Sequence, residues 1–429
     1  MKIRVVILAV CSLPASLNMG VCLAGDDPGI TDSLFNATGI ELAGFVETRW
    51  GERLRETPLE KDISIGESRI QLDLTKDFAA FTVKLKSDLL ADTVQDKVDI
   101  YLRDASLVFS PTDIMDVKIG RMVSTWGTGD LIFINDMFPK DWQSFFIGRN
   151  DEYLKQASNV IKSSIFIGDF AFDLVYTPLF TGSEYVNGER LSYFNPLAGK
   201  IAGRDQHIDA VTPDHYFSDS EIAGRLSRRF NSVEISLYGY SGFWQEPEGI
   251  DSGSEKATYP RLNVWGMSTR LPLFSGIASF EAGYYDSIHD DNGRNPLVRP
   301  SEYRFLAGFE QELAHELTGG IQFYLEKIAD YTNYRNALPK KMHTRDEYRQ
   351  MLTLRLTQLL LEQNLTLSFF MYYSPTDNDG YVRPEIGYKL TDNWLLDGGL
   401  NLFFGAHEYT FWGRFQDDTN AYLGLRYSF

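Results

Sequence analysis

The sequence predicts an all-β protein: a closed transmembrane barrel of about eighteen antiparallel strands that run up and down in chain order. Three observations predict this fold. From Ile40 onward, segments of about ten residues alternate apolar and polar side chains. The links between the segments alternate between tight turns and longer loops. The last segment keeps its apolar alternation up to a terminal phenylalanine, Phe429.

The alternation defines the strands. In residues 317–326, apolar side chains such as Ile321 and Phe323 alternate with polar ones such as Gln322. Period two with one apolar face is typical of a strand whose two faces meet different media, and about ten tilted residues cross the hydrocarbon of a bilayer. The predicted strands are 40–50, 64–75, 78–87, 97–110, 114–123, 159–167, 169–176, 219–230, 232–242, 260–271, 276–286, 301–313, 316–326, 346–359, 363–373, 379–390, 393–403 and 419–429.

The links support a barrel rather than a sandwich. Nearly all of the links between the tight ones are longer, and short periplasmic turns that alternate with long extracellular loops are typical of outer-membrane barrels. This parity places both ends of the barrel on the periplasmic side. An open sheet edge in lipid would leave costly unpaired amides, so the sheet must close. The tight links carry Lys76-Asp77, Pro111-Thr112-Asp113, Gly168-Asp169, Asn231, Pro272-Leu273-Phe274, Ala314-His315, Glu362 and Thr391-Asp392.

The last predicted strand places Ala421, Leu423, Leu425, Tyr427 and Phe429 on one face. In this pattern the sequence resembles the bacterial outer-membrane β-barrel porin class, whose members end in an aromatic residue after alternating apolar positions. The resemblance implies that Tyr427 and Phe429 form a signal read by the barrel-assembly machinery. It also implies an outer membrane of a Gram-negative bacterium, with lipid and lipopolysaccharide around the barrel.

The N-terminal residues 1–24 are expected to be a cleaved signal peptide. Lys2 and Arg4 precede a short apolar run, and small residues precede a cleavage point at Gly25. The alternatives are a membrane-anchoring helix, which Pro14 and nearby polar residues interrupt, and a lipoprotein signal, for which the residues before Cys22 fit poorly. Residues 25–39 are expected to form an N-terminal periplasmic arm or to enter the lumen, and residues 40–429 to form the barrel.

Composition narrows the function classes. The only two cysteines, Cys11 and Cys22, lie inside the predicted signal peptide, so the mature protein is expected to have no disulfide, thiolate metal site or covalent haem motif. The net charge of −18 argues against nucleic acid or an anionic surface as a partner and fits long, solvated loops. No stretch after the signal peptide is apolar for long enough to form a helical span.

The parity opposite to the apolar face must line the interior. A charge that faces lipid at mid-depth costs about 2–4 kcal/mol for Arg or Lys, so these charges need water or each other. They could form cross-strand ion pairs that tie the wall together, or a transverse field across a wet lumen that orients polar solutes. The candidate pore-lining residues are Arg49, Glu67, Arg69, Asp73, Lys84, Lys86, Arg225, Glu281, Arg304, Arg355, Arg383 and Arg426.

Two stretches, 124–158 and 177–218, are too long for simple connections. The first is rich in aromatic residues, including Trp126, Phe133 and Trp142, and so predicts a loop folded inward onto the wall. The rival interpretation is a hairpin that extends the barrel above the membrane. A barrel of this size encloses more space than its wall side chains fill, so an inward loop would narrow the pore. The candidate constriction residues are Asp130, Asp136, Lys140, Asp141, Arg149 and Asp151.

A second resemblance lies at the start of this loop. Gly120-Arg121, followed by Trp126-Gly127 and Asp130, is similar to the Gly-Arg-Gln motif before an inserted loop in alginate-export-type and related large porins. Met122 stands where those proteins have Gln, and the mixed charge of this lumen differs from the strongly basic interior of alginate exporters, so no substrate carries over. Because Arg121 has the outward parity, we expect a bulge that turns it inward.

No catalytic residue, metal site or cofactor is predicted. The sequence contains no nucleophile-elbow, zinc-protease or phosphate-loop motif. His289-Asp290-Asp291 could belong to a rim hydrolase or to a plain solvated loop. Acidic residues near Asp377 and Asp417-Asp418 lack the spacing of an EF-hand.

Three functions remain. The first is an outer-membrane porin, a water-filled channel for passive diffusion of small hydrophilic solutes or ions. Such a porin could form a homo-oligomer. The alternatives are a barrel scaffold of an export or electron-conduit assembly and a rim-located hydrolase.

Overall fold

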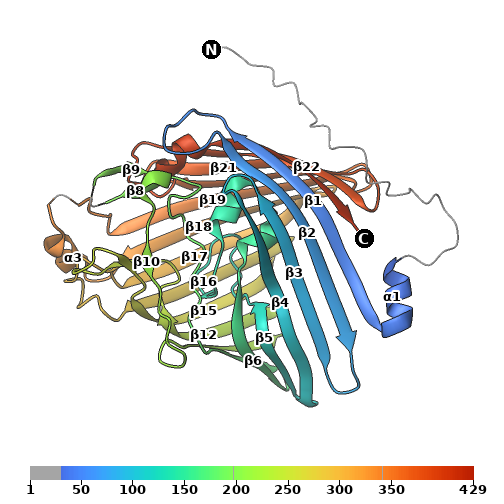
Figure 1. Ribbon diagram of the computed structural model, residues 1–429. Coiled ribbons are helices and arrows are strands. Elements are labelled where there is room, and N and C mark those ends of the chain that lie inside the picture. Colours follow the sequence, from blue (N-terminus) through green and yellow to red (C-terminus); the bar gives the residue numbers. More distant parts are fainter. Residues whose placement is uncertain (1–29, 197, 341) are drawn as a thin grey trace.

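The computed structural model describes residues 30–196, 198–340 and 342–429. The predicted signal peptide and both cysteines lie outside the described residues. Eighteen strands form one antiparallel sheet in which neighbours in the barrel are neighbours along the chain, and β1 pairs with β23 to close it (Figure 1). The prediction of a closed 18-stranded barrel is confirmed.

The barrel strands are β1 (Ile40–Arg53), β2 (Ile63–Asp77), β3 (Thr82–Asp92), β4 (Lys97–Thr112), β5 (Met115–Val123), β6 (Ala157–Ile167), β7 (Phe170–Thr177), β11 (Glu221–Phe230), β12 (Val233–Phe243), β15 (Arg261–Leu273), β16 (Gly276–Ser287), β17 (Glu302–Ala314), β18 (Leu317–Ile328), β19 (Tyr348–Leu360), β20 (Leu365–Ser374), β21 (Asp379–Lys389), β22 (Trp394–Gly405) and β23 (Asn420–Ser428).

The two ends of the barrel differ, and we call them the turn end and the loop end. Tight links such as 168–169 and 231–232 join strands at the turn end, where Gly168 and Asn231 adopt positive φ. At the loop end, the third loop (124–156) and the fourth loop (178–220) are the longest links. The links 93–96 and 375–378 at this end are tight as well, so the predicted alternation has two exceptions.

Short elements lie mainly at the loop end or within its loops. They are α2 (Trp142–Ile147), η1 (Asp151–Leu154), β8 (Tyr193–Asn195), β9 (Lys200–Ala202), η2 (Arg204–Gln206), β10 (Ala210–Val211), β13 (Gly249–Ile250), β14 (Ala257–Thr258), α3 (Tyr331–Ala337) and η3 (Gly413–Asp418).

The N-terminal helix α1 (Ile30–Thr38) lies outside the barrel beside the turn end, where the chain also finishes (Figure 1). Residues 30–38 of the expected arm therefore do not enter the lumen. None of the helices in the described ranges is long and apolar enough to cross a bilayer.

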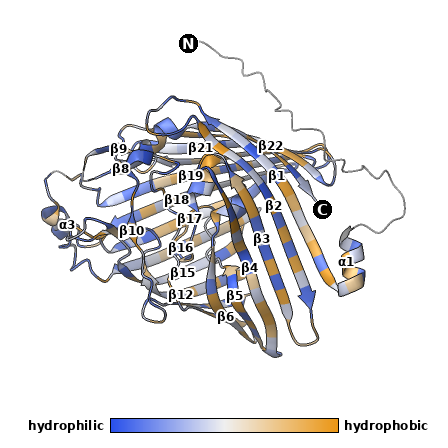
Figure 2. Ribbon diagram, viewed as in Figure 1, coloured by the Kyte–Doolittle hydropathy of each residue, from blue (hydrophilic) through white to orange (hydrophobic). Residues whose placement is uncertain are grey.

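Opposite faces of each strand meet different surroundings. In β18, Ile321 and Phe323 are 59% and 41% exposed on the outer face, whereas Tyr324 and Glu326 are buried inside. The same alternation appears as stripes along the strands (Figure 2). Trp394 and Tyr427 pack together on the outer wall at the turn end. Aromatic rings at the ends of an apolar outer band are typical of a transmembrane barrel.

The closing seam involves the last residue. Phe429 and Gly44 exchange two backbone hydrogen bonds of 3.0 Å. Gly44 has no room for a side chain, because a Cβ there would meet the Phe429 ring at 2.8 Å. The aromatic terminus predicted as an assembly signal thus lies against β1, where the barrel closes.

The bulge expected at Arg121 is absent. The register of β5 against β6 runs unbroken through Arg121, which stays on the face of exposed Ile119. The extra residue lies instead in β4, where Arg103 interrupts the pairing with β3. The bulge lets Arg103 reach the carbonyls of Glu152 and Lys155, at 2.8 and 3.3 Å. The expectation was wrong because the carbonyl groups that accept these hydrogen bonds inside the barrel lie opposite β4, which carries Arg103.

Candidate functional site: a loop folded inside the barrel

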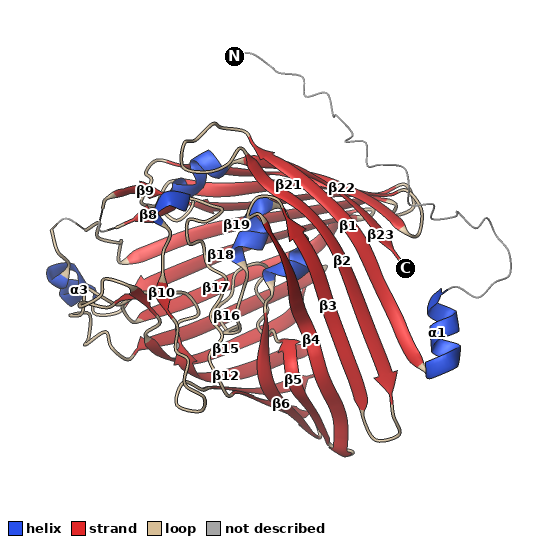
Figure 3. Cartoon of the chain, viewed as in Figure 1, coloured by secondary structure: helices blue, strands red, loops and turns tan. Residues whose placement is uncertain are grey.

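The third loop carries α2 and η1 into the space enclosed by the strands (Figure 3). The helix α2 begins where the Asp141 side chain accepts a hydrogen bond from the Ser144 amide at 2.8 Å, and it ends at Gly148 with φ of 88°. A Cβ on Gly148 would collide with the Tyr422 ring of β23 at 2.2 Å. The positive φ and this close approach both require glycine.

Aromatic packing fixes one side of the loop. Phe145 and Phe146 are each 1% exposed. The Phe146 ring lies 5.6 Å from both Phe403 of β22 and Trp412, and 5.1 Å from Phe415, centroid to centroid. Burial of each such ring stabilises the inward path by about 1.5–3 kcal/mol.

Charged residues of β1 and its neighbours hold the end of α2. Arg49 donates to Asp397 at 2.7 Å and, from the same side chain, to the Gly148 carbonyl at 2.9 Å and the Asn150 side chain at 3.1 Å. Arg426 pairs with Glu47 at 2.9 Å. Two of the predicted pore-lining arginines, Arg49 and Arg426, therefore bind carboxylates of the wall. Both also contact the third loop, Arg426 through Glu152 at 3.5 Å.

A second group centres on Glu67 of β2. Its carboxylate pairs with Arg149 of the third loop at 2.5 Å, and with Arg69 and Arg190 at 3.3 Å each. Arg69 also pairs with Asp88 at 2.7 Å. All five side chains are largely buried, so each charge depends on its partners, because an unpaired buried charge is strongly destabilising.

A third group is built on Glu281 of β16. Its buried carboxylate accepts hydrogen bonds from the amides of Thr128 and Gly129, the latter at 2.7 Å, and from the amide and side chain of Asn135 at 3.2 and 2.8 Å. Gly127, with φ of 88°, turns the chain toward this carboxylate. One wall carboxylate thus organises the first turn of the loop.

Two further wall arginines bind loop aspartates. Arg355 of β19 pairs with Asp130 at 2.5 Å, and Arg383 of β21 pairs with Asp151 at 2.6 Å. Burial raises the pKa of Asp130, and the facing Arg355 guanidinium opposes that shift. The loop is therefore bound to strands on several sides of the barrel.

The other predicted constriction residues act within the loop. Asp136 and Lys140 form a buried pair at 3.1 Å, and Lys140 also donates to the Phe138 carbonyl at 2.6 Å. Burial lowers the pKa of Lys140, against the effect of Asp136. Asp141 caps α2 and lies 3.6 Å from Arg149. These contacts hold the path of the loop.

The remaining pore-lining candidates lie on the inner wall. Arg225 pairs with Asp173 at 2.6 Å, and Lys86 lies 3.9 Å from Asp73 and 3.8 Å from Glu152. Lys84 is exposed on the same face as Lys86. Most of the candidates thus occur as ion pairs, and their pore-lining role stays a prediction.

Sequence reasoning missed three members of one charged group, namely Glu302, Arg299 and Arg345. Arg304, a candidate, pairs with Glu302, which also lies 3.0 Å from Arg299. Arg299 and Arg345 both reach Glu326. The inward parity of Glu302 was a usable signal, whereas Arg299 and Arg345 lie in links that have no periodic pattern.

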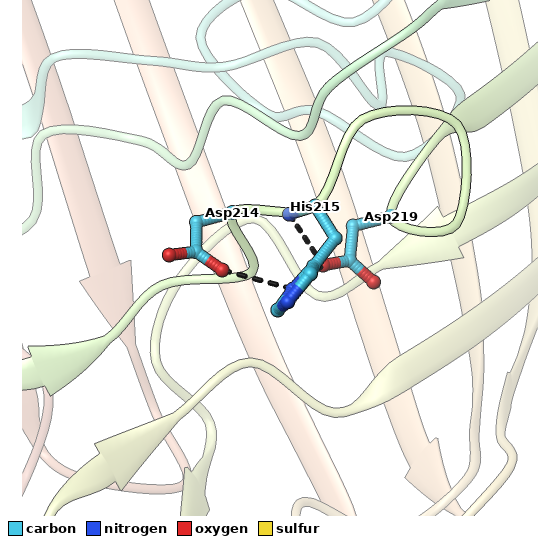
Figure 4. Close-up of side chains that lie close together, drawn as sticks. All are labelled: Asp214, His215 and Asp219. Carbon is cyan, nitrogen blue, oxygen red and sulfur yellow. Dashed lines mark hydrogen bonds and ion pairs between the residues drawn. The ribbon is translucent and has the colours of Figure 1, made fainter.

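One group in the described part of the chain has geometry compatible with a metal ion: Asp214, His215 and Asp219 of the fourth loop (Figure 4). His215 Nδ1 lies 2.9 Å from Asp214 and 3.5 Å from Asp219. Asp219 also lies 3.6 Å from Arg261, which already balances its charge. His215 and Asp214 are exposed, and exposed acidic groups commonly occur without a bound ion.

The motif His289-Asp290-Asp291 forms a turn. Asp290 is buried and accepts a hydrogen bond from the Ser301 amide at 3.1 Å, while His289 is exposed. Among the described residues, no ion pair joins His289 to either aspartate.

Comparison with solved structures identifies the fold. OccD3 (OpdP) of Pseudomonas aeruginosa matches with a TM-score of 0.53 at 9% identity, over 91% of both chains. OccK11 (OpdR) of the same organism matches with 0.52 at 10% identity, over 91% of this chain and 96% of that one. OccAB1 of Acinetobacter baumannii also gives 0.52 at 10% identity, over 91% and 97%.

The fold is that of an outer-membrane porin. Such a barrel implies the Gram-negative outer membrane. No protein-family model and no curated protein matches the sequence. At these identities the likeness concerns the fold alone, and the resemblance of residues 120–130 to alginate-export-type porins stays a prediction.

Proposed function

We propose that this outer-membrane porin forms a water-filled channel for passive diffusion of small hydrophilic solutes or ions, and that its third loop constricts the channel. The observation that carries the proposal is the charged inner wall bound to that loop through Glu67, Glu281, Arg355 and Arg383. Charges inside a barrel require water or partners, and a loop held on several sides narrows the lumen without blocking it.

Partial exposure inside the barrel supports a wet passage. The side chains of Arg225 and Arg355 keep 27% and 34% of their surface exposed although they face inward. A cavity of about 50 Å³ lies between Asp130 of the loop and wall residues that include Arg270 and Glu310. A space of this size holds a few water molecules beside the loop.

The chain is expected to follow the biogenesis that its sequence predicts. Residues 1–24 are removed on export, and Tyr427 and Phe429 are read by the barrel-assembly machinery. The exposed apolar outer face then contacts lipid and lipopolysaccharide. The barrel is a monomer or a homo-oligomer. No cofactor, nucleic acid or catalytic residue takes part.

Planar-bilayer recording of the purified full-length protein tests the function. Stepwise conductance increases, with a reversal potential set by the salt gradient, are expected. Heat-modifiable migration on gels shows that the protein is folded. A folded barrel that inserts without conductance would contradict the channel and favour a scaffold of an export or electron-conduit assembly.

A further inference from the structure

A larger cavity of about 520 Å³ lies at the loop end, lined by residues of the third and fourth loops and of the links 244–260, 342–347, 375–378 and 406–419. Exposed His343 and Asp346 lie on its edge, so it opens to solvent. Small-molecule sites typically have volumes of about 300–1,000 Å³. The cavity is thus large enough for a solute to stop before it passes the loop.

Flat aromatic faces line two sides of this cavity. Phe133 and Trp142 come from the third loop, with ring centroids 5.9 Å apart. Phe411 and Trp412 come from the link 406–419, 4.6 Å apart and perpendicular. Lys140 lies over the Phe133 ring at 4.7 Å and Arg349 over the Phe411 ring at 5.6 Å. Phe133, Trp142 and Phe411 are only half-buried, so the exposed part of each side chain can contact a ligand with an apolar face.

The charges around the cavity balance. The acidic lining residues are Asp136, Glu246, Glu248, Glu326, Asp346 and Asp377. The basic lining residues are Lys140, Arg299, Arg304, Arg345, Arg349 and Arg414. Most of them already pair with one another, as Arg349 does with Asp377 at 2.6 Å. A site with both signs in equal number offers many donors and acceptors but no net attraction for an ion of either sign.

Three of these residues form no ion pair within the described part of the chain: Asp346 at the exposed edge, and Arg414 and Glu246. The Arg414 guanidinium lies over the rings of Phe411 and Phe415, at 5.2 and 5.7 Å, and its Nε is 3.5 Å from the Thr410 carbonyl. Burial raises the pKa of Glu246, and the positive charge of Arg414 opposes this rise. A hydroxyl group can accept from a guanidinium and donate to a carboxylate at once.

We propose that this cavity is a binding site for a short neutral oligosaccharide, with sugar rings against Trp142, Phe133 and Phe411 and hydroxyls between Arg414 and Glu246. The apolar C–H faces of a sugar ring match the aromatic surfaces, and its hydroxyls match the balanced donors and acceptors. The inference rests on the proposed channel function in one respect: the site is the first station for a solute that enters from the loop end.

Maltotriose is the probe that tests the site. In planar bilayers, maltotriose added at the loop end should block the wild-type current reversibly and saturably, and it should change tryptophan fluorescence of the detergent-solubilised barrel at the same concentrations. Trp142→Ala should weaken the apparent affinity about tenfold, the scale of one lost base-stacking or ring-stacking contact of roughly 1.4 kcal/mol. Arg414→Gln should weaken it several-fold.

Matched variants separate the site from the fold. Trp265→Ala removes a ring that is 53% exposed on the outer wall and should leave maltotriose block unchanged. Trp142→Phe should retain part of the affinity. If Trp142→Ala fails to give a heat-modifiable barrel, Phe411→Ala and Arg414→Gln decide the question, and wild-type affinity in both would overturn the site.

The controls distinguish the two proposals. Block by benzoate or arginine but not by maltotriose, in an open channel, overturns the saccharide assignment and leaves the channel intact. A maltotriose-dependent fluorescence change without any conductance supports the site and contradicts the channel. No effect of maltotriose on current or fluorescence overturns the site.

Discussion

The third and fourth loops are both long, yet they lie in different surroundings. The third loop buries Phe145 and Phe146 and binds wall charges on several strands. The fourth loop forms small strand pairs and leaves Tyr216 and Phe217 exposed, at 63% and 71%. Loop length therefore does not decide whether a loop enters a barrel. The third loop combines a dense run of aromatic residues with charges that pair with inner-wall charges of opposite sign.

Part of the fourth loop packs inside as well, since Leu191 is 1% exposed in the same hydrophobic core as Phe145 and Phe146. Arg190 is 2% exposed and pairs with Glu67 and Asp92. Burial lowers the pKa of Arg190, and Glu67 counteracts this. The wall carboxylate of Glu67 therefore binds an arginine from each of the two loops.

Deletion of residues 128–150 in the third loop is the most direct test of the difference between the two loops and should have the largest effect. We expect conductance to rise several-fold, because the segment that occupies the lumen is removed. Cation preference should fall modestly, since the deletion removes Asp130, Asp136 and Asp141 but only Lys140 and Arg149. Single-channel recording in salt gradients measures both.

Deletion of residues 212–218 in the fourth loop is the control and should leave conductance unchanged. Unaltered conductance after the third-loop deletion, in a folded barrel, would place that loop outside the passage.

Cysteine labelling sharpens the comparison at single residues. Arg225→Cys and Arg355→Cys should react with a water-soluble thiol reagent, whereas Leu354→Cys and Leu367→Cys on the lipid face should resist it. Arg69→Cys should react at least about tenfold more slowly than Arg355→Cys, because Arg69 is 4% exposed under the Tyr153 ring. The rates are followed by mass spectrometry.

Removal of the third loop should accelerate labelling of the Arg69→Cys variant. Fast labelling at positions 354 and 367 would mean that the register is shifted by one residue, which exchanges the two faces.

Glu281→Gln should loosen the first turn of the third loop. The substitution removes the carboxylate that accepts hydrogen bonds from Thr128, Gly129 and Asn135. Each buried hydrogen bond that is lost costs about 1–3 kcal/mol. We expect noisier open-channel current and about twofold higher mean conductance. Glu310→Gln, on the neighbouring strand and exposed in the lumen, serves as the matched control, and equal noise in both variants would contradict the anchoring role of Glu281.

The smallest expected effect is a pH step. Burial raises the pKa of Glu246 to about 7, Glu248 adds to this, and Arg299, Arg414 and a hydrogen bond with Trp142 oppose it. The carboxyl is therefore neutral below about pH 7 and anionic above it, so cation preference should rise slightly as the pH increases through this value. Reversal potentials between pH 6 and pH 8 measure the step, and Glu246→Gln should remove it. A step that persists in Glu246→Gln belongs to another group.

The sequence by itself determined the wall of this protein. Ile321 and Phe323 on one face and Gln322 on the other suffice to place β18, because a strand between lipid and lumen must alternate. The turns and the terminal Phe429 could also be predicted, because they too depend only on residues close together in the sequence. Aromatic residues between Trp126 and Phe146 also indicated an inward loop.

Only the tertiary structure decided which charged and polar groups meet. Glu67 with Arg149 and Arg190, Glu281 with Thr128, and Asp130 with Arg355 join residues far apart in the chain. Their pairing depends on the path of the loop, which no periodicity encodes. The bulge at Arg103 rather than Arg121, and the cavity between Trp142 and Arg414, follow from that path as well. Local alternation fixes a strand, whereas a contact across the lumen exists only after all eighteen strands have closed around the loop.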